Sequence, residues 1–590
     1  MSLAYPAFAT RRRVFDADWR KPFLLWMDGI EAGWAVPLLL VGFVGVWFVY
    51  MTLAYANGDL HSDVLEAWTV GRSINWGNDK HPPLMGWVAR AWTTVFPLTN
   101  WSLNLMALVN AAVGLWFVDL ISRRFVRGDK RFIVLLLLML MPIYQFHAQR
   151  FNANSVLLAT WPLATYCFLR SFETRETGWA VAAGAAAALV MLGKYYSVFL
   201  LAGFAFAAIA HQQRRVYFGS RAPWISMATG LVALAPHIYW LATTGALPCT
   251  YAVDRHLGKL LDASLAEGMV FVATALMLLA LPAAIWVLLA RSRLLSFVRD
   301  FRAMNSGLWL LFLLSIATIV LPPVTAVALR SSMMAIWSLQ GLFLFVILLV
   351  CGASYQIERD RVAALAAFTV GAALLSALIV APAHAVYRNT HPLHEGRNFY
   401  GQVAEELTRQ WHAQVGTPLQ VVGGDDALAF AMAFYSPDHP LYERRLVNPV
   451  PRPVPRRSNF ETGWVALCFN GDDFCATAMQ NIAEHAPRII RSEIVAQSSL
   501  WGLPGASDRF VAFIVPPSSA QPSTDTAPPP QNPVALPRIS ARDAAPGEAD
   551  RQSTASVEEP LFHLKSLDRL RRMWWGDLRW AVEGEFRLMR

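Results

Sequence analysis

Apolar stretches of about 17 to 25 residues recur along most of this chain, and they limit its fold more than any other feature. A helix needs about 20 apolar residues to cross the hydrocarbon core of a bilayer. Helices also satisfy their backbone hydrogen bonds there, where water is absent. Charged residues make up 15% of the chain, against about a quarter in soluble proteins. The sequence therefore predicts a polytopic α-helical membrane protein.

The distribution of basic residues predicts the orientation of about eleven spans. If the N-terminus is inside, the inner segments carry 21 Lys and Arg residues and the outer ones about 8. Basic residues concentrate on the cytoplasmic side, so we expect a cytoplasmic N-terminus and an outer C-terminal part. The net charge of +9 then needs no nucleic-acid partner. The expected spans are 33–55, 102–122, 132–147, 155–169, 178–193, 196–211, 223–241, 267–290, 306–323, 334–352 and 362–381.

The chain changes character after residue 382, which we take as the end of the transmembrane module 1–382. Residues 383–516 alternate short apolar runs with amphipathic stretches, which predicts a soluble α/β domain on the outer side. Residues 517–560 are rich in Pro, Ser, Ala and Thr and predict a disordered linker. Residues 561–590 place Leu, Trp and Phe at helical spacing with Arg opposite. This pattern indicates a basic amphipathic helix, which lies on the membrane or docks on protein.

Two of the five cysteines fall close together in the expected outer domain, in the stretch CFNGDDFC. Cys468 and Cys475 lack the companion His or Cys residues of a zinc site. An oxidising compartment favours a disulfide between them. Cys249 is expected to be a single thiol in an outer loop, whereas Cys167 and Cys351 lie within spans as packing residues.

The first outer loop, residues 56–101, is crowded with ionisable groups although it joins two apolar spans. Asp63 and Glu66 are three residues apart and share one face of a helix, which we expect to end at Pro82. A carboxylate near apolar surface can act as a general base. Other polar residues stand at the outer ends of later spans, where they serve as interfacial anchors or bind a phosphate-bearing substrate. They are Lys80, His81, His147, Arg150, Asn152, Asn154, Lys194, His237, Arg255, His256 and Arg330.

The first loop also carries a resemblance to a known family. DVLEAWTVGRSINWGNDKHPPLMGWV resembles the first extracytoplasmic loop of the GT-C glycosyltransferases, in the family 39 and aminoarabinose-transferase-like branch related to protein O-mannosyltransferases. That loop carries an early acidic residue, an aromatic-rich juxtamembrane helix and a basic residue before Pro. FNANSVLLATWPL and MLGKYYS are similar to segments of bacterial members, and the likeness covers roughly residues 30–350. It implies a GT-C enzyme of a bacterial inner membrane, with about 11 transmembrane helices and a periplasmic C-terminal α/β domain.

The resemblance also implies roles for individual residues. Asp63 matches the catalytic acidic residue, His81 stands where relatives have a basic residue before Pro, and Lys194 matches a basic position at the cavity mouth. Asn154 stands where many relatives have a second Asp, which argues against a two-carboxylate site because an amide cannot take a proton. The expected catalytic residues are Asp63 and Glu66, and the expected substrate-binding residues are Lys80, His81, Asn152, Asn154, Lys194, Tyr195, His237, His256 and Arg330.

The resemblance leaves a divalent cation near the donor phosphate open. Candidate ligands are His81, His237 and His256, because imidazole suits several transition metals. Lys80 replaces an acidic residue of the aminoarabinose enzymes, which argues against the same metal site.

The implied activity is inverting transfer of a sugar from a polyprenyl-phosphate donor to an acceptor of the cell envelope. The acceptor is lipid A, another glycolipid, a polysaccharide or a protein, and the sequence does not choose among them or name the sugar. Two alternatives stay open. A transporter or flippase of lipid-linked sugars would want charges near mid-bilayer, and a polymerase or ligase would share the donor and the outer face. No phosphate-binding GxxxxGK[ST] loop occurs in the chain.

Overall fold

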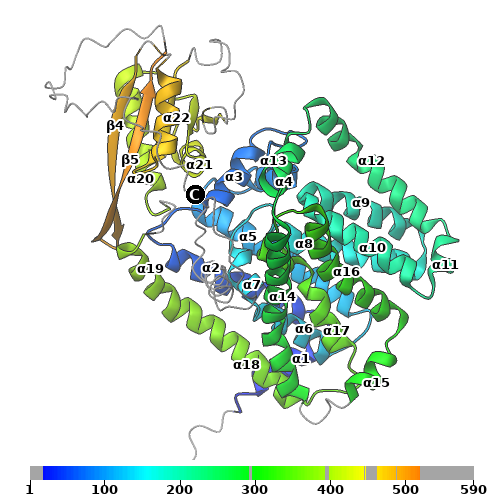
Figure 1. Cartoon of the computed structure of the whole chain (residues 1–590). Helices are drawn as coiled ribbons and strands as arrows, with labels where there is room; N and C mark the ends of the chain where they lie inside the picture. The colour runs from blue at the N-terminus through cyan, green and yellow to red at the C-terminus, as the bar shows by residue number, and fades with distance from the viewer. Residues whose placement is uncertain are drawn as a thin grey trace, which may run out of the picture.

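A computed structural model describes residues 18–290, 296–392, 397–443, 446, 462–484, 486 and 488–517. These residues form a helical bundle and a smaller part that contains a sheet (Figure 1). The expected linker 517–560, apart from its first residue, and the expected helix 561–590 lie outside the described residues.

The helical bundle contains apolar helices at the positions of the expected spans. Among the described residues, six are long and apolar enough to cross a membrane. They are α2 (Ala35–Ala54), α5 (Asn100–Ser122), α12 (Ala222–Thr243), α14 (Leu261–Ala290), α16 (Ser306–Leu329) and the continuous helix Arg359–Thr390, which contains α18 (Arg359–Leu375), the π-helical turn η5 (Ser376–Val380) and α19 (Ala381–Thr390). The bundle is therefore that of a multi-pass membrane protein.

The expected number of eleven spans is not confirmed by length and composition. The seventh candidate is α6 (Asp129–Met139) followed by α7 (Pro142–Gln145) and η1 (His147–Gln149), and its two halves are bent by 71°. Pro142 follows the break, and a proline cannot continue the hydrogen bonds of a preceding helix. The other expected spans hold helices that do not meet the same test: α8 (Leu157–Thr174), α9 (Thr177–Gly193), η2 with α10 (Tyr195–Ser197, Val198–Ala210) and η4 with α17 (Ala335–Gly341, Leu342–Cys351).

Small residues let these helices approach one another closely. In the alanine-rich α9, a Cβ atom on Gly184 would lie 2.2 Å from the carbonyl oxygen of Ser226 in α12. A Cβ on Gly114 of α5 would lie 2.1 Å from the carbonyl oxygen of Leu158 in α8. Membrane helices associate through close packing at such small residues, because burial of apolar surface gives little driving force within lipid.

The smaller part has a mixed five-stranded sheet in the order β2-β1-β3-β5-β4 among the described residues. β1 (Val421–Gly424) runs parallel to β2 (Leu441–Tyr442) and β3 (Trp464–Phe469), whereas β5 (Leu503–Val515) is antiparallel to β3 and β4 (Ile490–Leu500). Three helices accompany it: α20 (Tyr400–Val415), α21 (Asp426–Tyr435) and α22 (Asp473–Ala483). We call this part the C-terminal domain. Its disulfide between Cys468 and Cys475 confirms the expected pairing.

The C-terminal domain is joined to the bundle by a continuous helix and packs on the first outer loop. The helix Arg359–Thr390 passes through residue 382, the expected boundary, so the domain begins after it. Hydrogen bonds join the start of the first outer loop to the helix end and to the C-terminal domain. Asn57 donates to Asn389 and to Ser498, and the backbone N–H of Gly401 donates to Asp59. Figure 1 shows the domain, in yellow to orange, beside α3 (Ser62–Gly71), against which α21 packs.

Five short helices complete the described residues: α1 (Lys21–Asp28), α4 (Leu84–Thr93), α11 (Arg214–Phe218), α13 (Leu247–His256) and α15 (Phe297–Arg302). Of these, α4 matters most for the site, because it follows α3 within the first loop and crosses it closely. A Cβ on Gly71 would lie 2.4 Å from the carbonyl oxygen of Gly86. Two glycines thus allow the backbones of α3 and α4 to touch.

Candidate active site

The two expected catalytic carboxylates lie on α3, which begins at Ser62. His61 caps this helix: its Nδ1 accepts a hydrogen bond from the backbone N–H of Asp63 at 3.1 Å. An acidic residue in the first turn is favoured by the partial positive charge of a helix N-terminus. The helix ends at Gly71 and not at Pro82, because the chain turns there to bring α4 against α3. Asp63 and Glu66 are nevertheless on one helical face, as expected.

A single turn between η1 and α8 holds both the carboxylate of Asp63 and the ammonium of Lys194. The Nδ2 of Asn152 donates to the Oδ2 of Asp63 at 2.8 Å, and the Nζ of Lys194 donates to the Oδ1 of Asn154. The turn is closed by its own hydrogen bonds, since the Oδ1 of Asn152 accepts from the backbone N–H groups of Asn154 and Ser155 at 2.8 and 2.9 Å. The structure thus brings together four residues that the sequence placed in three separate segments.

The electrostatics of Asp63 and Lys194 suit a general base and a phosphate ligand. Burial, and then the Glu66 carboxylate, raises the pKa of Asp63, while the hydrogen bond from Asn152 and the charge of Arg150 oppose the rise. The Asp63 side chain keeps 42% of its surface exposed, so a substrate can reach it. Lys194 follows the last residue of α9, and burial lowers its pKa to about 7 although Asp63 opposes the shift.

Lys80 lies between two carboxylates from different parts of the molecule. Its Nζ is 2.5 Å from the Oδ2 of Asp426, at the start of α21 in the C-terminal domain, and 3.8 Å from the Oε1 of Glu66. Burial lowers the pKa of Lys80, but these two carboxylates outweigh it and the net shift is upward. Lys80 is therefore a charged ammonium in the site.

His81 is held beside these groups but in its neutral form. The Oδ1 of Asn78 accepts from the backbone N–H groups of Lys80 and His81, both at 2.7 Å, and so shapes the loop before the proline pair. Burial, together with the charges of Lys194 and Lys80, lowers the pKa of His81 to about 3. A neutral imidazole can donate one hydrogen bond to a phosphate oxygen, but it brings no positive charge.

The remaining expected substrate-binding residues lie outside the first loop. The Tyr195 hydroxyl lies 3.0 Å from the Nε2 of His237, whose Nδ1 faces the backbone oxygen of Trp76 in the first loop. The Nδ1 of His256 lies 2.6 Å from the Ser332 hydroxyl.

Trp337 links His256 to Lys194. The His256 and Trp337 rings meet edge to face, 5.5 Å apart, and the Lys194 ammonium lies 4.7 Å from the Trp337 ring centre. Arg330 is set apart from this arrangement. Its side chain is exposed, and within the described residues it joins none of these contacts.

The three histidines considered as metal ligands do not come together. His81 lies near Lys80 and Lys194. His237 pairs with Tyr195, and His256 pairs with Ser332. Within the part of the chain that the structure describes, no three His, Cys, Asp or Glu side chains are grouped so that they could hold an ion. The donor set here is instead rich in cations and amides.

Sequence reasoning missed three residues that shape the site. Asp426 was missed because it belongs to another domain, 346 residues after Lys80. His61 was visible as the residue before an expected helix, and its Nε2 lies 3.2 Å from a guanidinium nitrogen of Arg150. Trp337 gave no signal beyond being an aromatic residue within an apolar run. The side chain of Arg255 lies outside the described part of the structure.

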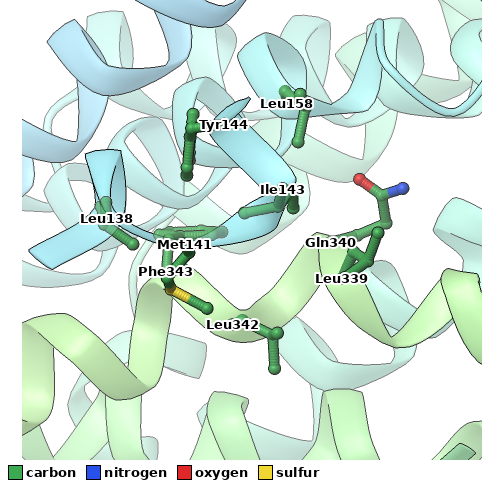
Figure 2. Close-up of a pocket in the computed structure, with 9 residues that line it drawn as sticks. All are labelled: Leu138, Met141, Ile143, Tyr144, Leu158, Leu339, Gln340, Leu342 and Phe343. Carbon is green, nitrogen blue, oxygen red and sulfur yellow. The ribbon is translucent and has the colours of Figure 1, made fainter. Parts of the chain in front are cut away.

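A small cavity inside the bundle is not this site. Its volume is about 10 Å³, and Leu138, Met141, Ile143, Tyr144, Leu158, Leu339, Gln340, Leu342 and Phe343 line it. Figure 2 shows the Gln340 amide beside apolar side chains. A cavity of this size holds one water molecule at most. None of the expected site residues lines it.

The chain is similar to known proteins in sequence and in fold. The sequence profile of the dolichyl-phosphate-mannose-protein mannosyltransferase family matches residues 80–240, which include Lys80, both asparagines of the turn, and Lys194. The crystal structure of ArnT from Cupriavidus metallidurans bound to undecaprenyl phosphate superposes with a TM-score of 0.53 at 14% identity, over 83% of this chain and 99% of that one. The chain has the GT-C fold of the ArnT-like proteins. The apo ArnT structure gives a TM-score of 0.52 at 15% identity, over 84% of this chain and 100% of that one.

One curated relative adds the chemical class. The lipid A galacturonosyltransferase RgtD from Rhizobium johnstonii is 24% identical over 205 residues. The match covers 34% of this chain and 42% of RgtD, so the chain spans less than half the length of that relative. The family and the relatives' names together indicate a glycosyltransferase of the protein-mannosyltransferase and ArnT-like kind.

Proposed function

We propose that this GT-C protein transfers a sugar, with inversion, from a polyprenyl-phosphate donor to an acceptor hydroxyl at the outer face of the membrane. The observation that carries the proposal is the Asn152–Asn154 turn. It holds a carboxylate and an ammonium side by side, which are the two groups that such a transfer needs. The bound undecaprenyl phosphate of the ArnT structure supports a lipid-phosphate donor.

Asp63 serves as the general base in this proposal. The acceptor hydroxyl gives its proton to the Asp63 carboxylate as its oxygen attacks the anomeric carbon, and the bond from that carbon to the phosphate oxygen breaks. Asn152 orients the carboxylate, and burial, followed by the neighbouring Glu66, raises its pKa, which makes it a stronger base. Glu66 also pairs with Lys80, so its own role is electrostatic.

The leaving phosphate gains negative charge during this step, and the cations of the site stabilise it. The charges of Lys194 and Lys80 both act on His81, so the three side chains lie near one another. Charge-assisted hydrogen bonds to phosphate are about twice as strong as neutral ones, and such preorganised donors lower the barrier where charge develops. The exposed Arg330 is a candidate for the outer rim of the donor site. The histidines supply imidazole hydrogen bonds.

The acceptor that we would test first is lipid A, because the curated relative is named for transfer to it. Other glycolipids, polysaccharides and proteins are the further acceptors of the same chemistry. We place the site at the outer face because Lys and Arg residues concentrate in the opposite loops. The resemblance to bacterial members implies that this is the periplasmic face of an inner membrane.

The experiment is transfer by the purified protein in lipid nanodiscs, with a labelled polyprenyl-phosphate sugar and lipid A, followed by mass spectrometry of the product. Asp63→Asn keeps the shape of the side chain but removes the proton acceptor. It should fold, bind the donor and transfer at least about 100-fold more slowly. Glu66→Gln should lose less.

Three results would contradict the proposal. Transfer at the wild-type rate by Asp63→Asn, with Glu66→Gln inactive, would assign the base to Glu66. Movement of the lipid-linked sugar across the membrane without a new glycosidic bond would favour a flippase, and joining of donor sugars to one another would favour a polymerase.

A further inference from the structure

The ion pair between Lys80 and Asp426 crosses the boundary between the first outer loop and the C-terminal domain. Both partners are partly shielded from water, with 20% and 38% of their side-chain surfaces exposed. The Lys80 ammonium also lies 5.7 Å from the centre of the Phe430 ring, one turn further along α21. Two residues of one helix, Asp426 and Phe430, thus lie against one ammonium of the site.

Asp426 is itself held rigidly by its own domain. Its Oδ1 accepts a hydrogen bond from the Tyr442 hydroxyl at 2.7 Å, which leaves Oδ2 for Lys80. The preceding residue, Asp425, caps α21 through hydrogen bonds from the backbone N–H groups of Ala427 and Leu428. A carboxylate fixed on both sides can define the position of a flexible lysine.

The whole of α21 is seated on α3, so this carboxylate cannot shift without the domain. The Trp68 ring of α3 meets the Phe434 ring of α21 edge to face at 5.2 Å. The Tyr435 hydroxyl donates to the side chain of Asn100 and accepts from the backbone N–H of Leu60. Arg72 donates to the backbone oxygen of Pro440 at 2.7 Å.

We propose that Asp426 is a positioning residue of the active site, which holds the Lys80 ammonium beside Glu66 so that its remaining N–H groups face the substrate phosphate. An ammonium has three donors, and one of them is directed at Asp426. The C-terminal domain thereby contributes to catalysis through Lys80, without touching the reacting atoms. This inference rests on the proposed function, which makes Lys80 a ligand of the donor.

A double-mutant cycle tests it, with Asp426→Asn, Lys80→Met and the double variant assayed for sugar transfer. Asp426→Asn should lower kcat/KM about tenfold, as expected for loss of a charge-assisted hydrogen bond, and Asp426→Glu should restore most of it. In the Lys80→Met background, Asp426→Asn should have no further effect. Residues that act through one another give such non-additive changes.

The matched control is Glu493→Gln, which removes a carboxylate of the same domain that pairs with Arg509 at 3.1 Å on the exposed strand β4. It should transfer at the wild-type rate. If Asp426→Asn loses as much in the Lys80→Met background as alone, or if it behaves as Glu493→Gln does, Asp426 does not position Lys80.

A second measurement needs no substrate. In the free protein, hydrogen exchange of residues 75–83 should be faster in Asp426→Asn than in the wild type, and unchanged in Glu493→Gln. Unchanged exchange in Asp426→Asn would overturn the proposal. If exchange is faster in Asp426→Asn but the wild-type protein transfers no sugar, only the proposed function is wrong, because the loop still depends on Asp426.

Discussion

At the scale of single residues, two asparagines two positions apart organise the chemistry. Asn152 serves the carboxylate and Asn154 serves the ammonium. An aspartate at position 154 would form an ion pair with Lys194 and compete with a substrate phosphate for it. The amide accepts a hydrogen bond without a charge, so it orients Lys194 and leaves the positive charge available. This gives a physical reason for the departure of this chain from the two-carboxylate pattern.

The pKa of Lys194 predicts how donor binding depends on pH. Burial lowers this pKa to about 7, so the free site carries the charge below pH 7 and loses it above. A sugar-phosphate diester does not titrate in this range, so binding above pH 7 must draw a proton onto Lys194. The donor dissociation constant should therefore rise with pH, by at most about tenfold for each unit above 7.

The measurement is a titration of a non-hydrolysable donor analogue in nanodiscs between pH 6 and 8.5. Lys194→Arg is the matched control, because an arginine stays charged throughout and its binding should change little with pH. A wild-type affinity that is constant across this range would mean that Lys194 does not contact the phosphate.

Residue types and topology were enough to find Asp63, Lys194 and the two asparagines, because charged and amide groups at the outer ends of apolar spans stand out. They were not enough to find Asp426. It lies among many acidic residues of a soluble domain, and only the docking of α21 on α3 brings it to Lys80. The sequence also could not show that the pKa of His81 is lowered, since that follows from its burial and then from the charges of Lys194 and Lys80.

At the scale of elements, the close crossing of α3 and α4 fixes the position of the helix that carries Asp63 and Glu66. Gly71 and Gly86 meet without side chains, and the atoms next to an added Cβ are backbone atoms that cannot rotate away. The sequence indicated a helix in this loop but placed its end wrongly, at Pro82 and not at Gly71. The end depends on the contact between the two glycines, which are fifteen positions apart and share no local pattern.

Gly71→Ala should therefore push α4 away from α3 and displace Asp63. Its Cβ would lie 2.4 Å from the carbonyl oxygen of Gly86, and overpacking of this kind costs about 1–3 kcal/mol. We expect a lower thermal midpoint in detergent and slower sugar transfer. In Gly45→Ala, on α2, the added Cβ has no atom within 4 Å, so both properties should be unchanged or slightly improved. Equal behaviour of the two variants would contradict the close crossing.

At the scale of the whole molecule, the bundle shows its lipid-facing side through exposed apolar residues. Only 6% of the most apolar part of α12 is buried within the protein, so the rest must contact lipid or another surface. Apolar periodicity located every one of the eleven helical positions. It could not decide how many of them cross fully, because breaks such as that before Pro142 depend on tertiary packing.

The one exposed free cysteine among the described residues provides a native test of orientation. Cys249 is exposed on α13, whereas Cys167 and Cys351 are buried and Cys468 and Cys475 are paired. If α13 is outside, a membrane-impermeant maleimide applied to spheroplasts should label the wild-type protein once, and Cys249→Ser should remain unlabelled. Labelling that appears only after the membrane is permeabilised would reverse the orientation of every site residue.

The ion pair between Lys80 and Asp426 can form only late in biosynthesis, since its partners are 346 residues apart. Ribosomes add about 5–20 residues per second, so Lys80 is made roughly 17 to 70 seconds before Asp426. During that interval the bundle can insert and assemble while this part of the site is unfinished. A nascent or prematurely terminated chain would then occupy the membrane without the contact that its completed form has. A domain that is made after the bundle thus completes the geometry begun in the first loop.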